Sequence, residues 1–152
     1  MSLYIGQKEV DFINNVNEEL ITDISSQYID YYRVDSKNSP QDNLYGESLN
    51  KTFNLPVRIY CLVDYIEPTS VTGIEGVDIQ YSIECQFLRS ILEEVNIYPR
   101  EGDFVKFGEI YYEIKNVLEV KQVAGQPIYK FDIICQCAPT RVDSLNIIDY
   151  NK

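Results

Sequence analysis

The sequence predicts a mainly β fold of the α+β class: a small β-barrel or sandwich with an N-terminal amphipathic helix and a short second helix. The 152 residues include 19 Ile, 13 Val, 13 Tyr and 6 Phe but only 2 Ala. β-Branched and aromatic residues favour strands, whereas Ala is the strongest helix former. Short apolar stretches separated by Gly- and Pro-containing turns indicate a barrel or sandwich. At this length we expect a single domain over residues 1–152.

Two segments have helical periodicity. Between residues 7 and 25, apolar side chains recur at spacings of three and four, which predicts an amphipathic helix. They are Val10, Ile13, Val16, Leu20, Ile21 and Ile24. A second helix of about two turns is expected from Leu88 to Val95. The adjacent acids at 18–19 and 93–94 fall on polar helix faces and do not converge as an acid/base pair would.

A β core is expected over residues 27–137. Residues 79–87 alternate apolar and polar side chains, which is typical of a strand with one buried face. Further strands are predicted at 27–34, 55–66, 104–107, 110–120 and 128–137. The adjacent tyrosines at 31–32 and 111–112 should each place one ring in the core and one outside.

Three polar segments lie outside this pattern. Residues 35–54 and 67–78 are predicted to be exposed loops, and residues 142–152 a polar C-terminal tail. Loops of this length in compact domains are usually functional or mobile. No stretch is apolar enough for a membrane span, and the first residues lack the pattern of a secretory signal, so we expect neither a membrane nor a secreted protein.

The composition argues against catalysis. The chain has no His, which removes the commonest general base and metal ligand. Its four cysteines lie inside predicted strands and are expected to be reduced, structural thiols: Cys61, Cys85, Cys135 and Cys137. There is no nucleophile elbow, P-loop or dinucleotide fingerprint. We therefore expect no enzyme, no cofactor and no metal, and a small cytoplasmic hydrolase that uses carboxylates is the alternative from a different class.

The acidic charge is unevenly distributed. The formal net charge is −11, which argues against a nucleic-acid-binding surface because phosphate neutralisation needs clustered Lys and Arg. Residues 1–50 carry 9 acids and 3 bases, residues 51–102 carry 8 and 4, and residues 103–152 carry 7 and 6. The surplus lies in the first two thirds of the chain, where it serves either solubility or a function.

A series of short strings resembles the neck proteins of T-even-like tailed phages, the head-completion or head-closure component between portal and tail. In chain order they are DFIN (11–14), NEEL (17–20), NLYGES (43–48), LPVR (55–58), FLR (87–89), NIYPREGD (96–103), YYEI (111–114) and TR (140–141). A strand–turn–strand pattern also looks like the broader phage stopper class. It contains Gly102-Asp103, Gly108 and the string YEI at 112–114.

The resemblance implies a virion protein that forms a ring of identical subunits. Its partners would be further copies of itself, a portal or adaptor ring on one side, and a tail terminator or tail tube on the other. Genomic DNA would pass through the middle without specific binding. A tail-terminator or tail-completion protein is the closest alternative.

Candidate contact residues follow from the loops and turns. Residues at subunit, portal or lumen contacts are expected to be Tyr45, Glu47, Glu67, Glu75, Asp78, Tyr98, Arg100 and Arg141. An acidic lumen would repel phosphate and let DNA slide. We further expect Glu67, Glu75 and Asp78 to lie on a loop that narrows the channel.

Overall fold

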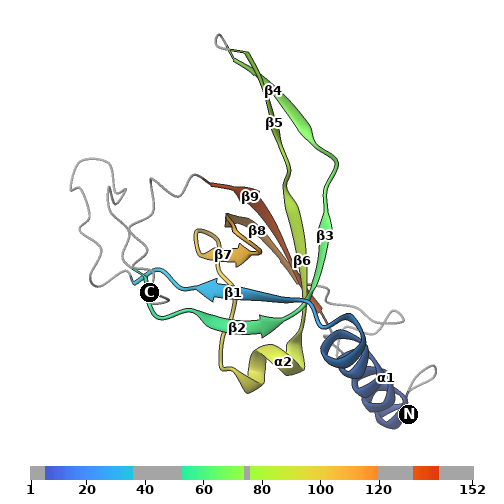
Figure 1. Cartoon of the computed structure of the whole chain (residues 1–152). Helices are drawn as coiled ribbons and strands as arrows, with labels where there is room; N and C mark the ends of the chain where they lie inside the picture. Colours follow the sequence, from blue (N-terminus) through green and yellow to red (C-terminus); the bar gives the residue numbers. More distant parts are fainter. Residues whose placement is uncertain (1–5, 36–52, 74–75, 120–131, 141–152) are drawn as a thin grey trace.

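A rolled, antiparallel seven-stranded sheet dominates the computed structural model, which describes residues 6–35, 53–73, 76–119 and 132–140 (Figure 1). The sheet is nearly closed into a barrel, with an N-terminal helix and a short second helix, so the predicted fold class is confirmed. The elements are α1 (Gln7–Glu19), a π-helix η1 (Leu20–Ser25), β1 (Tyr28–Tyr32), β2 (Val57–Tyr60), β3 (Leu62–Tyr65), β4 (Thr69–Gly73), β5 (Gly76–Gln80), β6 (Ile83–Leu88), α2 (Arg89–Glu94), β7 (Phe104–Phe107), β8 (Ile110–Glu119) and β9 (Asp132–Pro139). The strand order in the sheet is β2-β1-β7-β8-β9-β6-β3.

One apolar stretch of the chain supplies the strands at both edges of the sheet. Residues 55–66, predicted as one strand, divide at Cys61 into β2 and β3, which form opposite edges of the sheet. Gln27 bridges this junction: its carbonyl accepts from the Cys61 amide at 3.1 Å, and its side-chain Oε1 accepts from the Val63 amide at 3.0 Å. Because consecutive strands occupy both edges, the sheet has to roll.

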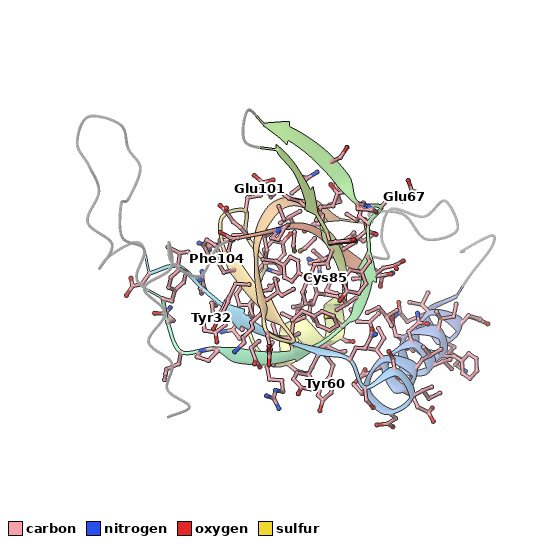
Figure 2. All side chains as sticks on the ribbon, turned by 45° about the horizontal axis from the view of Figure 1, so that its top comes forward. Tyr32, Tyr60, Glu67, Cys85, Glu101 and Phe104 are labelled. Carbon is pink, nitrogen blue, oxygen red and sulfur yellow. The ribbon has the colours of Figure 1, made fainter. Side chains whose placement is uncertain are left out.

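The core fills the inside of this roll. It is built from inward-facing side chains of the strands together with Ile91 and Leu92 of α2. All four cysteines are buried and free, with Cys85 near the centre of the view along the barrel (Figure 2). Burial raises the pKa of the Cys135 thiol, and contact with Cys85 together with burial raises that of Cys137.

The prediction that each tyrosine pair has one outward ring is wrong. Tyr31 and Tyr112 lie in the main core, but Tyr32 and Tyr111 are also only 7% and 5% exposed. Tyr32 and Tyr111 form a second apolar cluster with Phe104, against which Val34 and Phe53 pack. This cluster buries the outer face of the sheet, so both faces of β1 are covered at this point.

The N-terminal helix extends over the predicted residues but buries little of the predicted face. Its last six residues are π-helical, closed by the Ser26 amide donating to the Ile21 carbonyl at 3.0 Å. Val10 and Ile21 are buried, whereas the other four predicted positions are 37–75% exposed: Ile13, Val16, Leu20 and Ile24. The main core is built mostly from strand residues and includes only Ile21 of these six positions.

Residues 67–78 are not a loop. Most of them belong to the antiparallel hairpin of β4 and β5, which continues β3 and β6 and projects beyond the barrel (Figure 1). The Ile66 amide donates to the Ser82 carbonyl at 2.9 Å, which links the two ladders. The polar loop lies outside the described residues except at 35 and 53–54, as do the tail at 142–152 and the beginning of the last predicted strand.

Asp103 is the buried acid that organises the turn before β7. Its carboxylate accepts hydrogen bonds from the Tyr31 hydroxyl and from the Val34 amide, the latter at 3.0 Å. Its backbone carbonyl accepts from the Ile114 amide at 2.8 Å. Burial, together with this carboxylate, raises the pKa of Tyr31. The turn is thereby fixed to both β1 and β8.

We expect Tyr31→Phe to lower the free energy of unfolding by about 1–3 kcal/mol, because it leaves a buried carboxylate oxygen without its donor. Urea denaturation followed by circular dichroism measures the change. Tyr81→Phe is the matched control: Tyr81 is 54% exposed, so its loss of a hydroxyl should cost no more than about 0.5 kcal/mol. Equal, small effects of both substitutions would contradict a structural role for the Tyr31–Asp103 contact.

We also expect none of the four thiols to react with a thiol-specific reagent such as DTNB while the protein is folded. Each is buried, and the raised pKa of Cys135 and Cys137 keeps the reactive thiolate scarce. After unfolding in guanidinium without reductant, all 4 cysteines should react. Fast labelling of the native protein, or fewer than 4 thiols after unfolding, would refute this arrangement.

Candidate interaction surfaces

The structure describes half of the sequence-predicted contact residues. Tyr45, Glu47, Glu75 and Arg141 lie outside the described residues. Glu67 is exposed between β3 and β4 (Figure 2), and the backbone of Asp78 lies in β5 opposite Val71. Glu67 and Asp78 are therefore both placed on the projecting arm of the fold. Neither of them lines the two grooves described below.

Tyr98 and Arg100 come together in one surface groove. Its volume is about 550 Å³, and it is lined by Tyr98, Pro99, Arg100, Glu101, Val117 and Glu119. The Tyr98 hydroxyl donates to Glu119 of β8, which ties the 98–101 turn to the sheet. Two acids share this groove, yet one of them is the hydrogen-bond acceptor for Tyr98, which gives it a structural role.

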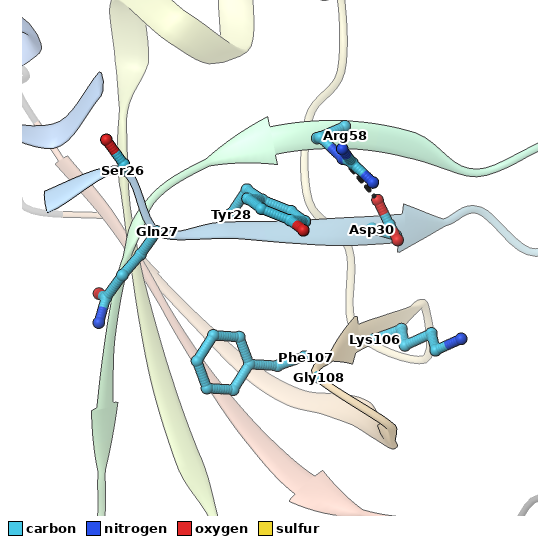
Figure 3. Close-up of a pocket in the computed structure, with 8 residues that line it drawn as sticks. All are labelled: Ser26, Gln27, Tyr28, Asp30, Arg58, Lys106, Phe107 and Gly108. Atoms are coloured by element: carbon cyan, nitrogen blue, oxygen red, sulfur yellow. Dashed lines mark hydrogen bonds and ion pairs between the residues drawn. The ribbon is translucent and has the colours of Figure 1, made fainter. Parts of the chain in front are cut away.

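A second groove, which we call the β1–β2 groove, was not predicted from the sequence. It has a volume of about 370 Å³ and is lined by Ser26, Gln27, Tyr28, Asp30, Arg58, Lys106, Phe107 and Gly108 (Figure 3). Strand register sets Asp30 directly opposite Arg58 of β2 on one side and Lys106 of β7 on the other. The result is a row of one acid between two bases.

Arg58 organises the wall of this groove. Its Nε lies 3.2 Å from Asp30 Oδ1, and its guanidinium carbon lies 4.1 Å from the centroid of the Tyr28 ring. Tyr28 in turn meets Tyr60 edge to face at 6.3 Å. Exposed tyrosine and arginine side chains held in place in this way are the residues that protein interfaces use most. Only the pairing register brings them together, so sequence spacing carried no signal for the groove.

A third surface is the outer side of the N-terminal helix. Phe12, Val16, Leu20 and Ile24 follow one another at intervals of four and are 68%, 42%, 42% and 75% exposed. We call these four residues the exposed stripe. The signal that could have revealed it was Phe12, which lies outside the apolar set assigned to the predicted buried face.

The described residues offer no metal cluster: no group of three or more Cys, Asp or Glu among them is arranged to hold a metal ion. Within the same ranges, no helix is long and apolar enough to cross a membrane. The three surfaces just described have the chemistry of contact surfaces: aromatic rings, an exposed apolar stripe, and side chains paired across strands.

Comparison with known protein families and with curated proteins found no match. Among solved structures, the chain is similar to the phage-like element PBSX protein xkdH from Bacillus subtilis at 14% identity and a TM-score of 0.36. The superposition covers 72% of this chain and 90% of that one. A similarity of this size carries no argument about what the present chain does.

Proposed function

We propose that this chain is a structural virion protein of the tailed-phage neck, which forms a ring between the portal or adaptor and the tail. In this role it closes the filled head, joins it to the tail and catalyses nothing. The observation that carries the proposal is the exposed stripe. A small barrel whose core is already filled leaves four large apolar side chains of α1 and η1 in solvent. Exposed apolar patches of this kind mark contact surfaces.

The strings that carry the family resemblance support the proposal because two of them meet in space. In the 96–103 string, the Gly102 amide donates to the Ile114 carbonyl at 2.9 Å, and Asp103 accepts from the Ile114 amide. Ile114 ends the 111–114 string. Strings that are separate in the sequence therefore form one structural unit, as expected if the resemblance reflects a shared fold.

The projecting hairpin suits a ring protein that has to meet DNA or a neighbouring ring. Glu67 begins this arm and Asp78 lies on it, in a chain that has 24 acids and 13 bases. Carboxylates on a channel wall would repel the phosphate backbone, so that DNA could slide without being held. We propose this arm as the part of the subunit that approaches the channel.

The purified full chain is expected to form closed rings. Negative-stain electron microscopy should show annular particles with a central opening, and sedimentation velocity should give one species heavier than the 17.7 kDa monomer. The same preparation should fail to retain duplex DNA on a native gel at low salt, because the acidic surface repels it.

A protein that stays monomeric over the accessible concentration range would contradict the ring. Rings that bind duplex DNA tightly would leave the oligomer intact but overturn the acidic channel. A basic protein of similar size, run on the same gel, controls for the detection of weak complexes.

A further inference from the structure

We propose that the exposed stripe of one copy docks in the β1–β2 groove of the next copy, as the head-to-tail contact that builds the ring. This inference deepens the proposed function and rests on it. The partner it names is a second copy of this chain, and the surfaces it names are α1 with η1 on one side and β1, β2 and β7 on the other.

The helix is apolar on two sides. Val10 and Ile21 face the protein and are 3% and 4% exposed, whereas the exposed stripe lies on the outer side and reaches 75% exposure at Ile24. A helix that only sealed its own barrel would need the first of these sides. The exposed stripe on the second side promotes aggregation of the protein unless another surface covers it.

The β1–β2 groove provides apolar area and positive charge for the exposed stripe to contact. Its side chains are aromatic and cationic: Tyr28 and Phe107 provide apolar area, and the row across the strands contains two bases, Arg58 and Lys106, against one acid, Asp30. A volume of about 370 Å³ falls within the range of roughly 300–1,000 Å³ typical of pockets that bind ligands. A large side chain such as that of Phe12 could therefore enter it.

The charges of the two surfaces are complementary. Residues 7–25 contain one base, Lys8, and five acids: Glu9, Asp11, Glu18, Glu19 and Asp23. Glu19 lies three residues after Val16 of the stripe, a spacing at which side chains are neighbours on the helix surface, so it lies at the margin of the stripe. An acid at the margin would meet the bases of the groove, which favours this pairing over random apolar contact.

A membrane does not fit the same stripe. Helices that lie on membrane surfaces carry Lys and Arg on their polar face, which attract anionic lipid headgroups. Residues 7–25 have the opposite charge pattern, with five acids and one base. A protein surface with exposed bases is therefore the better partner for the stripe, and the β1–β2 groove of this chain is such a surface.

The contact has to be between copies. Ser26 caps the C-terminal end of η1 and itself lines the groove, so the helical segment made of α1 and η1 ends at the rim of the groove. From there α1 extends outward, away from β1 and β2 (Figure 1). The stripe cannot fold back onto its own groove without breaking the helix. Two different patches that meet in this way form a heterologous interface, which closes into a ring when the rotation between subunits allows it.

Leu20→Ser and Arg58→Gln test the two sides of the contact. Each should raise the dissociation constant for self-association by about tenfold or more, because the loss of a side chain at the centre of an interface, where hot spots cluster, has an effect of this size. Leu118→Ser is the matched control: Leu118 lies on β8, is 46% exposed against 42% for Leu20, and belongs to neither surface. It should change the constant by no more than about twofold. Sedimentation velocity measures association, and circular dichroism checks that each variant is folded.

Cross-linking supplies an independent readout. A double variant, Ile24→Cys with Lys106→Cys, should form an oxidised ladder of dimers and higher species on a non-reducing gel, while each single variant should not. Rings that persist at wild-type strength in Leu20→Ser and Arg58→Gln, without a ladder, would overturn this contact and leave the ring itself standing. A wild-type chain that stays monomeric at every concentration tested would overturn both the contact and the ring.

Discussion

The rest of the structure depends on one constraint: a single apolar stretch supplies both edges of the sheet. β2 and β3 are separated only by Cys61, yet they lie at opposite ends of the strand order. Gln27 fixes the junction by accepting from the amides of Cys61 and Val63, one through its backbone and one through its side chain. The sheet therefore rolls, and the roll encloses the core.

Closure also explains what remains outside. A narrow barrel is filled mainly by its own inward side chains. The N-terminal helical segment adds Ile21 to the core, and Glu18 accepts a hydrogen bond from Ser90 of α2. The strands β3 and β6 continue past the barrel as the hairpin β4–β5, since their ladder is interrupted only briefly around Ser82. The helix and the hairpin are thus the two parts of the described chain that extend outward from the barrel (Figure 1). In the proposed ring, these are the parts that would meet neighbouring copies.

The sequence predicted the strands and helices well because period-two and period-four patterns are local. It failed where the outcome depends on distant pairing. The residues next to Tyr32 and Tyr111 in the sequence do not indicate that these rings cluster with Phe53 and Phe104. The alternation of the strands alone predicts that both rings are exposed to solvent. Asp30, Arg58 and Lys106 are far apart in the chain, and only the register aligns them. The Gly and acidic residues of 67–78 predict a loop because they are typical of turns, yet the backbones of β4 and β5 pair along their whole length.

The acidic charge of the chain also affects which surfaces of two copies could come into contact. A net charge of −11 keeps copies apart in solution. Association then needs local places where the sign changes, and the row containing Arg58 and Lys106 is such a place within a predominantly acidic chain. In the proposed contact, the acids of α1 would be repelled by most of a neighbouring copy's acidic surface and attracted to its β1–β2 groove. In the proposed ring, general repulsion combined with one attractive groove would disfavour wrong contacts between copies while leaving the proposed contact open.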